Sequence, residues 1–412
     1  MSIFVLMNLP KKLRIKLNSR KETNSLRSLK VPSSLVDFSS NDYLGFAKSE
    51  AIFNKTHQFL IDRNSKQNGA TGSRLLSGNH LLYKEVEAFL SDFHQTESAT
   101  IFNSGYDANI GFFSAVPQRG DVILYDEFIH ASIRDGIQLS NAKSFKFKHN
   151  SLTNLDEILK RVQYDNSHVY VVTEAVFSMD GDSPDLVQFS KICQKNKAFL
   201  IVDEAHAVGV FGKNGVGIVQ ELDLQHHVFV RIITFGKGLG CHGAAILGSN
   251  ELQQYLVNFA RSLIYTTGLS PHSLATIKMA YNEMLKQVQH KEKLKENIDF
   301  FKSEIKRLKM YALPKEETPK RQWGFIESNS AIHCCVIAGN KKVKLISEQL
   351  QEKGFDVRAI LSPTVKENQE RLRFCLHRYN SSQEISEVLQ LLPIFIERYT
   401  ELVSGPHKEN EK

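Results

Sequence analysis

Cysteine is scarce in this chain, with five among 412 residues. The number is odd and no two cysteines form a C-x-x-C pair, so neither a disulfide framework nor a zinc site is indicated. A long apolar run is also missing, because none approaches the ~20 residues of a membrane span. The opening MSIFVLMNLP is too short for a secretory leader and has no basic residue ahead of its apolar letters. We therefore expect a cytoplasmic protein that binds neither a metal nor a membrane.

A strong charge of one sign is lacking as well. Lysine and arginine total 52 against 45 aspartates and glutamates, which gives a net charge of +7. The densest stretch, KLKENIDFFKSEIKRLK, interleaves acidic and basic residues as a solvated helix face does. This pattern argues against a nucleic-acid partner. Hydrophobic residues at 42% and a length of 412 residues instead indicate a globular protein of two or three domains.

Short β-rich runs alternate with helical stretches through the middle of the chain. Such alternation predicts an α/β fold, with a mostly parallel sheet sandwiched by helices. In sheets of this kind, ligands bind beyond the carboxyl ends of the strands. The predicted strands are SATIF (98–102), DVILY (121–125), HVYVVTE (168–174), AFLIVDE (198–204), VRIITF (230–235) and GAAILGS (243–249).

The two ends of the chain differ from this middle part. Residues 8–37 are polar and basic with a helical pattern, and residues 275–310 are helical without an internal glycine or proline. After the connection MYALPKEETP, the patterns predict a smaller α+β unit with strands at 331–339, 355–360 and 371–376 and helices at 341–353 and 382–401. We expect three parts: an N-terminal segment at 1–45, a large cofactor-binding domain at 46–282 and a small C-terminal α+β domain at 283–412.

A lysine, an aspartate and a histidine lie at or just after the ends of two of the predicted strands. Lys237 lies in TFGKGLG after the run VFVRIITF, Asp203 ends FLIVD, and His206 comes three residues later. Free lysine has a pKa near ~10.4 and is a poor nucleophile, so Lys237 needs a special environment. Its neighbours Gly236 and Gly238 would let a cofactor approach the backbone closely. Together these residues suit a carbonyl cofactor that forms a Schiff base, above all pyridoxal 5'-phosphate.

Asp203 and His206 fit defined positions on this cofactor. The Asp203 carboxylate would pair with a protonated pyridine nitrogen, an interaction of ~4 kcal/mol at ~4 Å and an effective dielectric near 20. That proton makes the ring an electron sink. His206 would reach the phenolic oxygen of the ring. Judged alone, Lys237 also fits a surface turn and Asp203 a helix cap, but the combination favours the cofactor.

Five further residues complete the predicted cofactor site. The string NSGYDANIGFFSAV places Gly105 and Tyr106 at a helix N-terminus, which favours a phosphate, and Thr234 would add a hydroxyl. His130, in FIHASIRDG, would stack on the cofactor ring. Ser178, in TEAVFSMDGD, would hydrogen-bond the phenolic oxygen or a substrate carboxylate. Each of these residues also fits a structural role when it is judged alone.

Two short sequence strings resemble nucleotide-binding motifs instead. DEAH is also the magnesium-binding box of a group of helicases, but the G-x-x-x-x-G-K-[ST] loop that must accompany it is absent. GLGCHG matches the dinucleotide fingerprint G-x-G-x-x-G, but it leads into an apolar run rather than a helix. A nucleotide-binding ATPase or dehydrogenase is therefore the alternative from a different class. A non-catalytic scaffold would require all the motif strings to be incidental.

In this order the motifs resemble the α-oxoamine synthases, fold-type-I pyridoxal-phosphate enzymes that condense an amino acid with an acyl thioester. The resemblance runs from about Arg27 to Arg373, and its strings are FSSNDYLG, TEAVFSMDGDSPDL, VDEAHAVGVFGKNGVG, TFGKGLG and IYTTGLSP. They are most similar to the biotin-pathway branch, which joins L-alanine to pimeloyl thioester. The resemblance leaves open the branches that use glycine or serine, and whether coenzyme A or a carrier protein holds the acyl group.

The resemblance also implies roles for individual residues. Lys237 would hold the cofactor and move the α-proton of the amino acid. Arg373, the second arginine of RLRFCL, would hold the substrate carboxylate, a task suited to a bidentate guanidinium. Asn41 would point into the same pocket. Arg27 would meet the acyl substrate, with Thr364 on the same side.

The resemblance further implies a homodimer whose sites form at the subunit interface. Thr266 or Thr267 would then reach the cofactor phosphate of the neighbouring subunit. One stretch departs from the family pattern: where R-P-P-T-V-P is common, this chain reads LSPTVK, with Leu361 in place of the arginine and Lys366 after the valine. We expect altered contacts to the acyl chain or thioester. His242, just past the lysine loop, receives no role.

Overall fold

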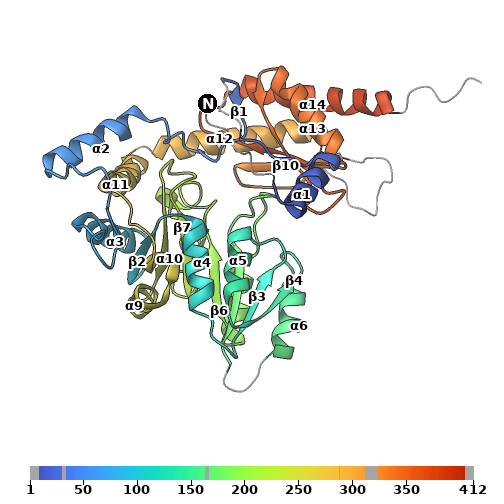
Figure 1. Ribbon diagram of the computed structural model, residues 1–412. Coiled ribbons are helices and arrows are strands. Elements are labelled where there is room, and N and C mark those ends of the chain that lie inside the picture. Colours follow the sequence, from blue (N-terminus) through green and yellow to red (C-terminus); the bar gives the residue numbers. More distant parts are fainter. Residues whose placement is uncertain (1–8, 30–33, 163–166, 287, 311–322, 404–412) are drawn as a thin grey trace, which may run out of the picture.

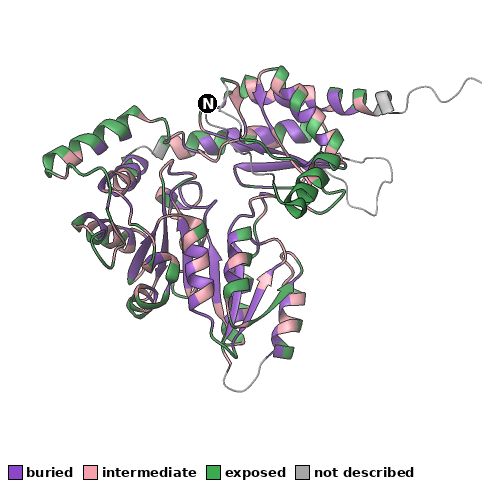
Figure 2. Cartoon of the chain, in the orientation of Figure 1, coloured by how far each residue is buried: buried purple, intermediate pink, exposed green. Residues whose placement is uncertain are grey.

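The computed structural model describes residues 9–29, 34–162, 167–286, 288–310 and 323–403. A seven-stranded sheet and a four-stranded sheet organise this part of the chain, and each is covered by helices (Figure 1). The central strands of both sheets are buried, whereas helix α1 (Lys11–Glu22) contributes no buried residue (Figure 2).

The larger sheet is mostly parallel, with the strand order β2-β8-β7-β6-β5-β3-β4. The five strands from β7 to β4 in this order pair in parallel, and β8 runs antiparallel to β2 and β7. Parallel strands end at a common edge, so the residues that follow them are brought together. The strands are β2 (Ser98–Phe102), β3 (Val122–Asp126), β4 (Lys143–Phe147), β5 (Val169–Glu174), β6 (Phe199–Asp203), β7 (Val230–Thr234) and β8 (Ala244–Gly248).

Helices cover both faces of this sheet because successive strand residues point to opposite sides. In β6, Leu200 and Val202 join one apolar cluster and Ile201 joins the other. The cluster with Ile201 includes residues of α4 (Gly105–Ala115), α5 (Ala131–Leu139), α9 (Asn250–Phe259) and α10 (Arg261–Ile264). The cluster with Leu200 and Val202 includes residues of α2 (Glu50–Asp62), α3 (Leu81–Phe93), α6 (Leu152–Val162), α7 (Leu186–Lys195), α8 (Ile218–Glu221) and α11 (Pro271–Lys286).

The smaller sheet is antiparallel, with the order β12-β13-β10-β9. Strand β1 (Val36–Asp37) pairs separately with β11 (Phe355–Asp356), so the N-terminal segment adds to this C-terminal unit. The remaining elements are the 3-10 helix η1 (Lys213–Gly215), α12 (Val288–Arg307), β9 (Trp323–Phe325), β10 (Ile332–Ile337), α13 (Asn340–Glu352), β12 (Arg358–Ile360), β13 (Arg371–Cys375) and α14 (Ser382–Val403).

The predicted α/β architecture is confirmed, and the ends of the six strands predicted for the large sheet lie within one residue of those observed. A helical pattern was predicted over residues 8–37, but among the described residues of this range only α1 is helical. Its charged letters fit a helix, but α1 has no apolar face that packs on the core.

The connection MYALPKEETP lies outside the described residues apart from Met310. The boundaries at residues 45 and 282 stay predictions. In the described part of the chain, no helix is long and apolar enough to cross a membrane.

Candidate active site

Three neighbouring strands end at one edge of the large sheet and bring reactive side chains together. Glu174 ends β5, Asp203 ends β6, and the two are register partners. Lys237 follows β7, the next strand in the sheet. A cavity of about 260 Å³ opens beside them, lined by Asn41, Ser104, Gly105, Tyr106, Asn109, His130, Ser132, Glu174, Asp203, Ala205, Thr234, Gly236, Lys237, His242 and Gly243.

Lys237 has the environment that its chemistry requires. Its Nζ lies 2.8 Å from Nε2 of His206. Burial lowers the pKa of Lys237 to about 8, although the acidic side chains of Asp203 and Glu174 act in the opposite direction. The uncharged amine, which is the nucleophilic form, is therefore far more accessible near neutral pH than in an ordinary lysine.

His206 lies behind Lys237 and is almost fully buried, at 5% exposed. Burial, followed by the positive charges of Lys237 and Arg373, holds the pKa of His206 well below its ordinary value. The imidazole is therefore neutral. Its Nδ1 lies 2.7 Å from the hydroxyl of Tyr43, which is fully buried.

Asp203 is fixed from two sides. Its Oδ2 accepts a hydrogen bond from Nδ2 of Asn109 at 3.1 Å, and its Oδ1 accepts one from the backbone N–H of Ala205 at 2.9 Å. The same Asn109 amide also donates to Oγ of Ser132 at 2.9 Å. Among the residues that the structure describes, buried Asn109 Oδ1 has no hydrogen-bond partner. The Asp203 carboxylate is thus held in place at the cavity wall.

His130 caps the N-terminus of α5 and connects to the same network. Its Nδ1 accepts from the backbone N–H of Ser132 at 3.2 Å and lies 2.7 Å from the Ser132 hydroxyl. Its own backbone N–H donates to Oε1 of Glu174 at 2.6 Å. Burial lowers the pKa of His130, so a neutral imidazole lines the cavity.

The predicted phosphate cradle lies at the start of α4, across from Thr234. Ser104 caps this helix by accepting from the backbone N–H of Asp107 at 3.1 Å. A Cβ on Gly105 would come within 2.6 Å of Thr234 Cγ2, so only glycine fits there without a shift. Tyr106 donates to Oδ2 of Asp135 at 2.5 Å. A helix N-terminus of this kind favours an anion.

The two glycines beside Lys237 differ in what they do. Gly236 lines the cavity, as expected of a residue that a cofactor approaches. A Cβ on Gly238 would instead meet the carbonyl oxygen of Val208 at 2.8 Å. The second glycine therefore lets the lysine loop pack on the segment that follows His206.

Arg373, predicted to hold the substrate carboxylate, is 8% exposed and lies at the side of the cavity that Asn41 lines. Its Nη2 donates to Oδ1 of Asn41 at 3.0 Å, and its Nε donates to the backbone carbonyl of Ser178 at 2.7 Å. Its Nη1 donates to Sγ of Cys375 at 2.9 Å. Ser178 thus contacts the site through its main chain, and its hydroxyl makes no hydrogen bond within the described part of the chain.

The residues expected to meet the acyl substrate contact each other but are not among those that line the cavity. Nη2 of Arg27 donates to Oγ1 of Thr364 at 3.0 Å, which joins the N-terminal segment to the LSPTVK loop. Lys366 of that loop forms an exposed ion pair with Glu127 at 3.0 Å. His242 lines the main cavity, although the sequence suggested no role for it.

Three residues of this network were missed by sequence reasoning. Glu174 and Asn109 lie inside strings that were singled out for other letters, and Tyr43 lies two residues after Asn41. Their positions depend on the register of β5 with β6 and on contacts between distant segments. No spacing along the chain reveals such contacts.

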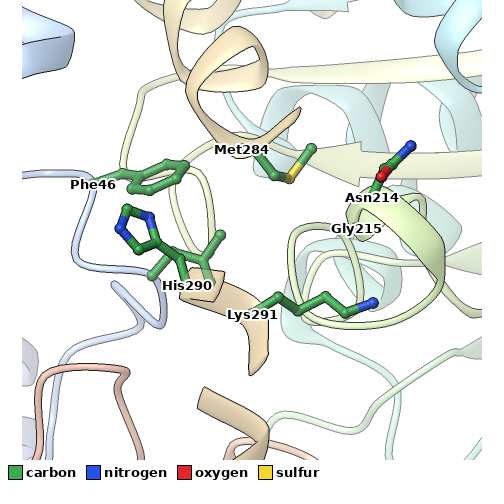
Figure 3. A pocket seen from close by; sticks show the side chains of 7 residues that line it. Phe46, Asn214, Gly215, Met284, His290 and Lys291 are labelled. Atoms are coloured by element: carbon green, nitrogen blue, oxygen red, sulfur yellow. The ribbon is translucent and has the colours of Figure 1, made fainter. Parts of the chain in front are cut away.

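A second hollow lies apart from this chemistry, between Phe46, His290 and Met284 (Figure 3). Its volume is about 10 Å³, which suffices for about one water molecule. The ring of His290 meets the ring of Phe46 edge-on with centroids 5.7 Å apart. This hollow is a packing defect next to the segment that carries Tyr43.

The residues of the large cavity fit pyridoxal phosphate. Gly105 and Thr234 leave room at a helix N-terminus for the phosphate, Asp203 offers a fixed carboxylate, and Lys237 offers a buried amine. The aminotransferase class I and II family matches residues 33–392. The chain belongs to this family.

Two proteins named 8-amino-7-oxononanoate synthase are similar to this aminotransferase-family chain over most of its length. The 8-amino-7-oxononanoate synthase of Emericella nidulans is 39% identical over 94% of this chain and 95% of its own length. A crystal structure of 8-amino-7-oxononanoate synthase from Francisella tularensis superposes with a TM-score of 0.73 at 27% identity, covering 89% of this chain and 99% of that one.

The fold extends to a third protein. A serine palmitoyltransferase variant from S. paucimobilis, solved with a bound pyridoxal-phosphate–myriocin aldimine, superposes with a TM-score of 0.83 at 24% identity over 95% of this chain and 98% of that one. The predicted pyridoxal 5'-phosphate dependence is confirmed by the family and its relatives, and the chain is an acyltransferase-type enzyme.

Proposed function

We propose that this enzyme condenses L-alanine with a pimeloyl thioester to give 8-amino-7-oxononanoate, carbon dioxide and a free thiol, as a step of biotin biosynthesis. The observation that carries the proposal is the placement of Lys237, with a pKa lowered to about 8, beside a cavity that Asp203 and Asn41 line and Arg373 flanks. The extended similarity to an 8-amino-7-oxononanoate synthase supports the choice of substrates.

Each residue of the site has a task in this reaction. Bound pyridoxal phosphate supplies an electron sink for negative charge at the α-carbon of the amino acid. Lys237 would hold the cofactor through Nζ, and Asp203 would face its pyridine nitrogen. Gly105 and Thr234 would hold the phosphate. Ser178 and His206 would lie near the phenolic oxygen, and His130 would stack on the ring.

Proton transfer falls to Lys237 because its amine is partly uncharged near neutral pH. The α-proton of alanine passes to Nζ, and the α-carbon then joins the acyl carbon as the thiol departs. The alanine carboxylate, held by Arg373 and Asn41, leaves as carbon dioxide. Lys237 returns a proton to the same carbon.

We also propose that two copies of the chain form the working enzyme. Leu76, Leu81 and Tyr265 are 85%, 71% and 72% exposed. They lie in segments joined by the bridge between Ser73 and Thr267. Asn103, next to the phosphate cradle, donates to Thr266 Oγ1 at 3.1 Å. Apolar exposure beside an active site is typical of a protein interface. The cytoplasmic location stays a prediction.

The test combines spectra with turnover. Purified enzyme is titrated with alanine, glycine and serine while the visible absorbance of the cofactor is followed, and turnover is measured with pimeloyl, acetyl and palmitoyl thioesters. We expect alanine with pimeloyl thioester to give the highest kcat/KM, and Lys237→Ala to abolish turnover and borohydride trapping at position 237. A preference for glycine with acetyl thioester or serine with palmitoyl thioester would overturn the substrates but not the family. Tight binding of ATP or NAD without bound aldehyde would overturn the whole proposal.

A further inference from the structure

Five side chains form a continuous line of hydrogen bonds from Lys237 to Arg373. Lys237 Nζ lies 2.8 Å from His206 Nε2, and His206 Nδ1 lies 2.7 Å from the Tyr43 hydroxyl. That hydroxyl donates to Asn41 Oδ1 at 3.3 Å, and Arg373 Nη2 donates to the same oxygen at 3.0 Å. The line joins the proton-carrying lysine to the arginine proposed to hold the substrate carboxylate.

The middle of this line is shielded from solvent. Tyr43 is fully buried, and His206 is 5% exposed. The turn that carries Tyr43 is fixed because Asp42 accepts from the backbone N–H of Phe46 at 2.8 Å. The Tyr43 ring also stacks on His377, with centroids 6.5 Å apart. A polar group in such a place needs partners within the protein, since an unmade hydrogen bond there is costly.

The protons in the line can be arranged in two ways, because a tyrosine hydroxyl has one proton and a neutral imidazole has one N–H. When Lys237 is charged it can only donate, so His206 Nε2 must accept and Nδ1 carries the proton. His206 then donates to the Tyr43 oxygen, and Tyr43 donates to Asn41. When Lys237 is neutral its lone pair can accept from Nε2–H, and Tyr43 can turn its proton to Nδ1.

We infer that Tyr43 is a positioning residue that matches the tautomer of His206 to the protonation state of Lys237. This inference rests on the proposed function, in which Lys237 takes up and returns a proton in each turnover. Tyr43 can accept from or donate to His206, so each state of the lysine leaves the imidazole with two partners. Phenylalanine at this position would fill the same space but would leave His206 Nδ1 without one.

The effect should appear in the pH dependence of kcat. A charged Lys237 requires the Nδ1–H tautomer, and without the Tyr43 hydroxyl that N–H is buried and unpaired. The charged form is then disfavoured, so the pKa of Lys237 should fall further below its value of about 8. The other charged or titratable groups facing Lys237 stay in place in such a variant: Asp203, Glu174, Arg373, Cys375, His206 and His130.

The experiment compares Tyr43→Phe with Tyr281→Phe in the pyridoxal-phosphate enzyme. Tyr281 is an apt control because it is also fully buried and its hydroxyl lies 2.8 Å from Nε2 of a buried histidine, His94, which lies away from the cavity. For Tyr43→Phe we expect kcat to fall on the order of ten-fold, the scale of one lost orienting hydrogen bond. The acidic limb of the kcat profile should move to lower pH by about one unit, with KM for the acyl thioester changed less than about two-fold.

Each result has a defined meaning. A Tyr43→Phe enzyme with the wild-type kcat and the wild-type limb overturns the inference while the proposed function stands. An equal shift of the limb in Tyr281→Phe also overturns it, because the effect would then be general. Wild-type protein that binds no pyridoxal phosphate removes the proposed function, and this inference with it. If Tyr43→Phe fails to fold, 3-fluorotyrosine at position 43 keeps the shape and weakens the oxygen as an acceptor; it should move the limb in the same direction, and an unmoved limb overturns the inference.

Discussion

Glu174 and Asp203 lie opposite each other at the ends of adjacent parallel strands. Both side chains are buried, at 4% and 5% exposed. Burial, and then the neighbouring charge of Asp203, raises the pKa of Glu174 well above its ordinary value. A buried carboxyl group beside another negative charge favours its neutral form, so we expect Glu174 to carry a proton. Asp203 instead accepts two hydrogen bonds from N–H donors.

Because we expect Glu174 to be protonated, we predict that the neutral side chain of glutamine can replace it. Glu174→Gln keeps an oxygen that accepts from the His130 backbone N–H, so kcat/KM should stay within about three-fold of wild type. Glu174→Ala leaves that N–H unpaired, which costs ~1–3 kcal/mol and loosens the start of α5. Steady-state kinetics and the visible absorbance of the cofactor measure both variants. Equal losses in the two would show that the negative charge of Glu174 is needed.

The sequence predicts the large sheet well because its buried strands are apolar runs bounded by polar letters. Strand β4, KSFKF, was missed, since its first four residues are exposed at the sheet edge and its lysines hide the pattern. The segment FDVRAI was predicted as one strand but supplies β11 and β12 to two different sheets. Which sheet a strand joins depends on tertiary packing, which a local pattern does not contain.

The site likewise has features that the local sequence predicts and features that depend on tertiary packing. Lys237, Asp203, His130 and Gly105 lie at or near the ends of predicted elements, and all four line one cavity. The link between Tyr43 and His206 spans 163 positions, so no local spacing predicts it. Positions at strand ends can therefore be predicted from sequence, whereas the hydrogen bonds that orient their side chains require the fold.

Because Gly105 lies close to Thr234, we predict that a side chain at position 105 would clash with the Thr234 methyl group, and that removing this methyl group would relieve the clash. Gly105→Ala places a Cβ 2.6 Å from Thr234 Cγ2. Overpacking of this kind costs ~1–3 kcal/mol, so the affinity for pyridoxal phosphate should fall roughly 5- to 150-fold. Thr234→Ser removes the methyl group but keeps the hydroxyl, and the double variant should recover most of the affinity. Fluorescence titration of cofactor-free protein measures the Kd, and a double variant as weak as Gly105→Ala would contradict the steric explanation.

Two arginines of β13 allow a matched test of substrate binding. Arg373→Lys loses the planar pair of donors, so the KM for the amino acid should rise about 10- to 100-fold while the cofactor stays bound. Arg371 is also buried, at 3% exposed, but donates to Asp180 and to the Met179 carbonyl, away from the cavity. Arg371→Lys should lower Tm and leave that KM near its wild-type value. A KM raised equally by both changes would point to a general disturbance of β13.

His149 predicts a pH-dependent stability. Burial lowers the pKa of His149, but hydrogen bonds to Asp126 and Asp182, at 2.9 and 2.8 Å, outweigh this and raise the pKa to about 10. The folded protein therefore binds this proton more tightly than the unfolded chain, whose histidine pKa is near ~6.5. The stabilisation is complete below that value and is lost as the pH rises through about 10.

The Tm difference between wild type and His149→Gln should accordingly be largest at pH 6 and should shrink steadily towards pH 10. His168→Gln is the control, because the His168 side chain is mostly exposed and its Nδ1 lies 3.4 Å from Asp121, farther than either carboxylate lies from His149, so the pair should contribute little. Its Tm difference should be small at every pH. Thermal unfolding followed by circular dichroism at pH 6, 8 and 10 measures both variants. A His149→Gln difference that grows with pH would mean that the neutral imidazole, rather than the charged one, holds the two aspartates.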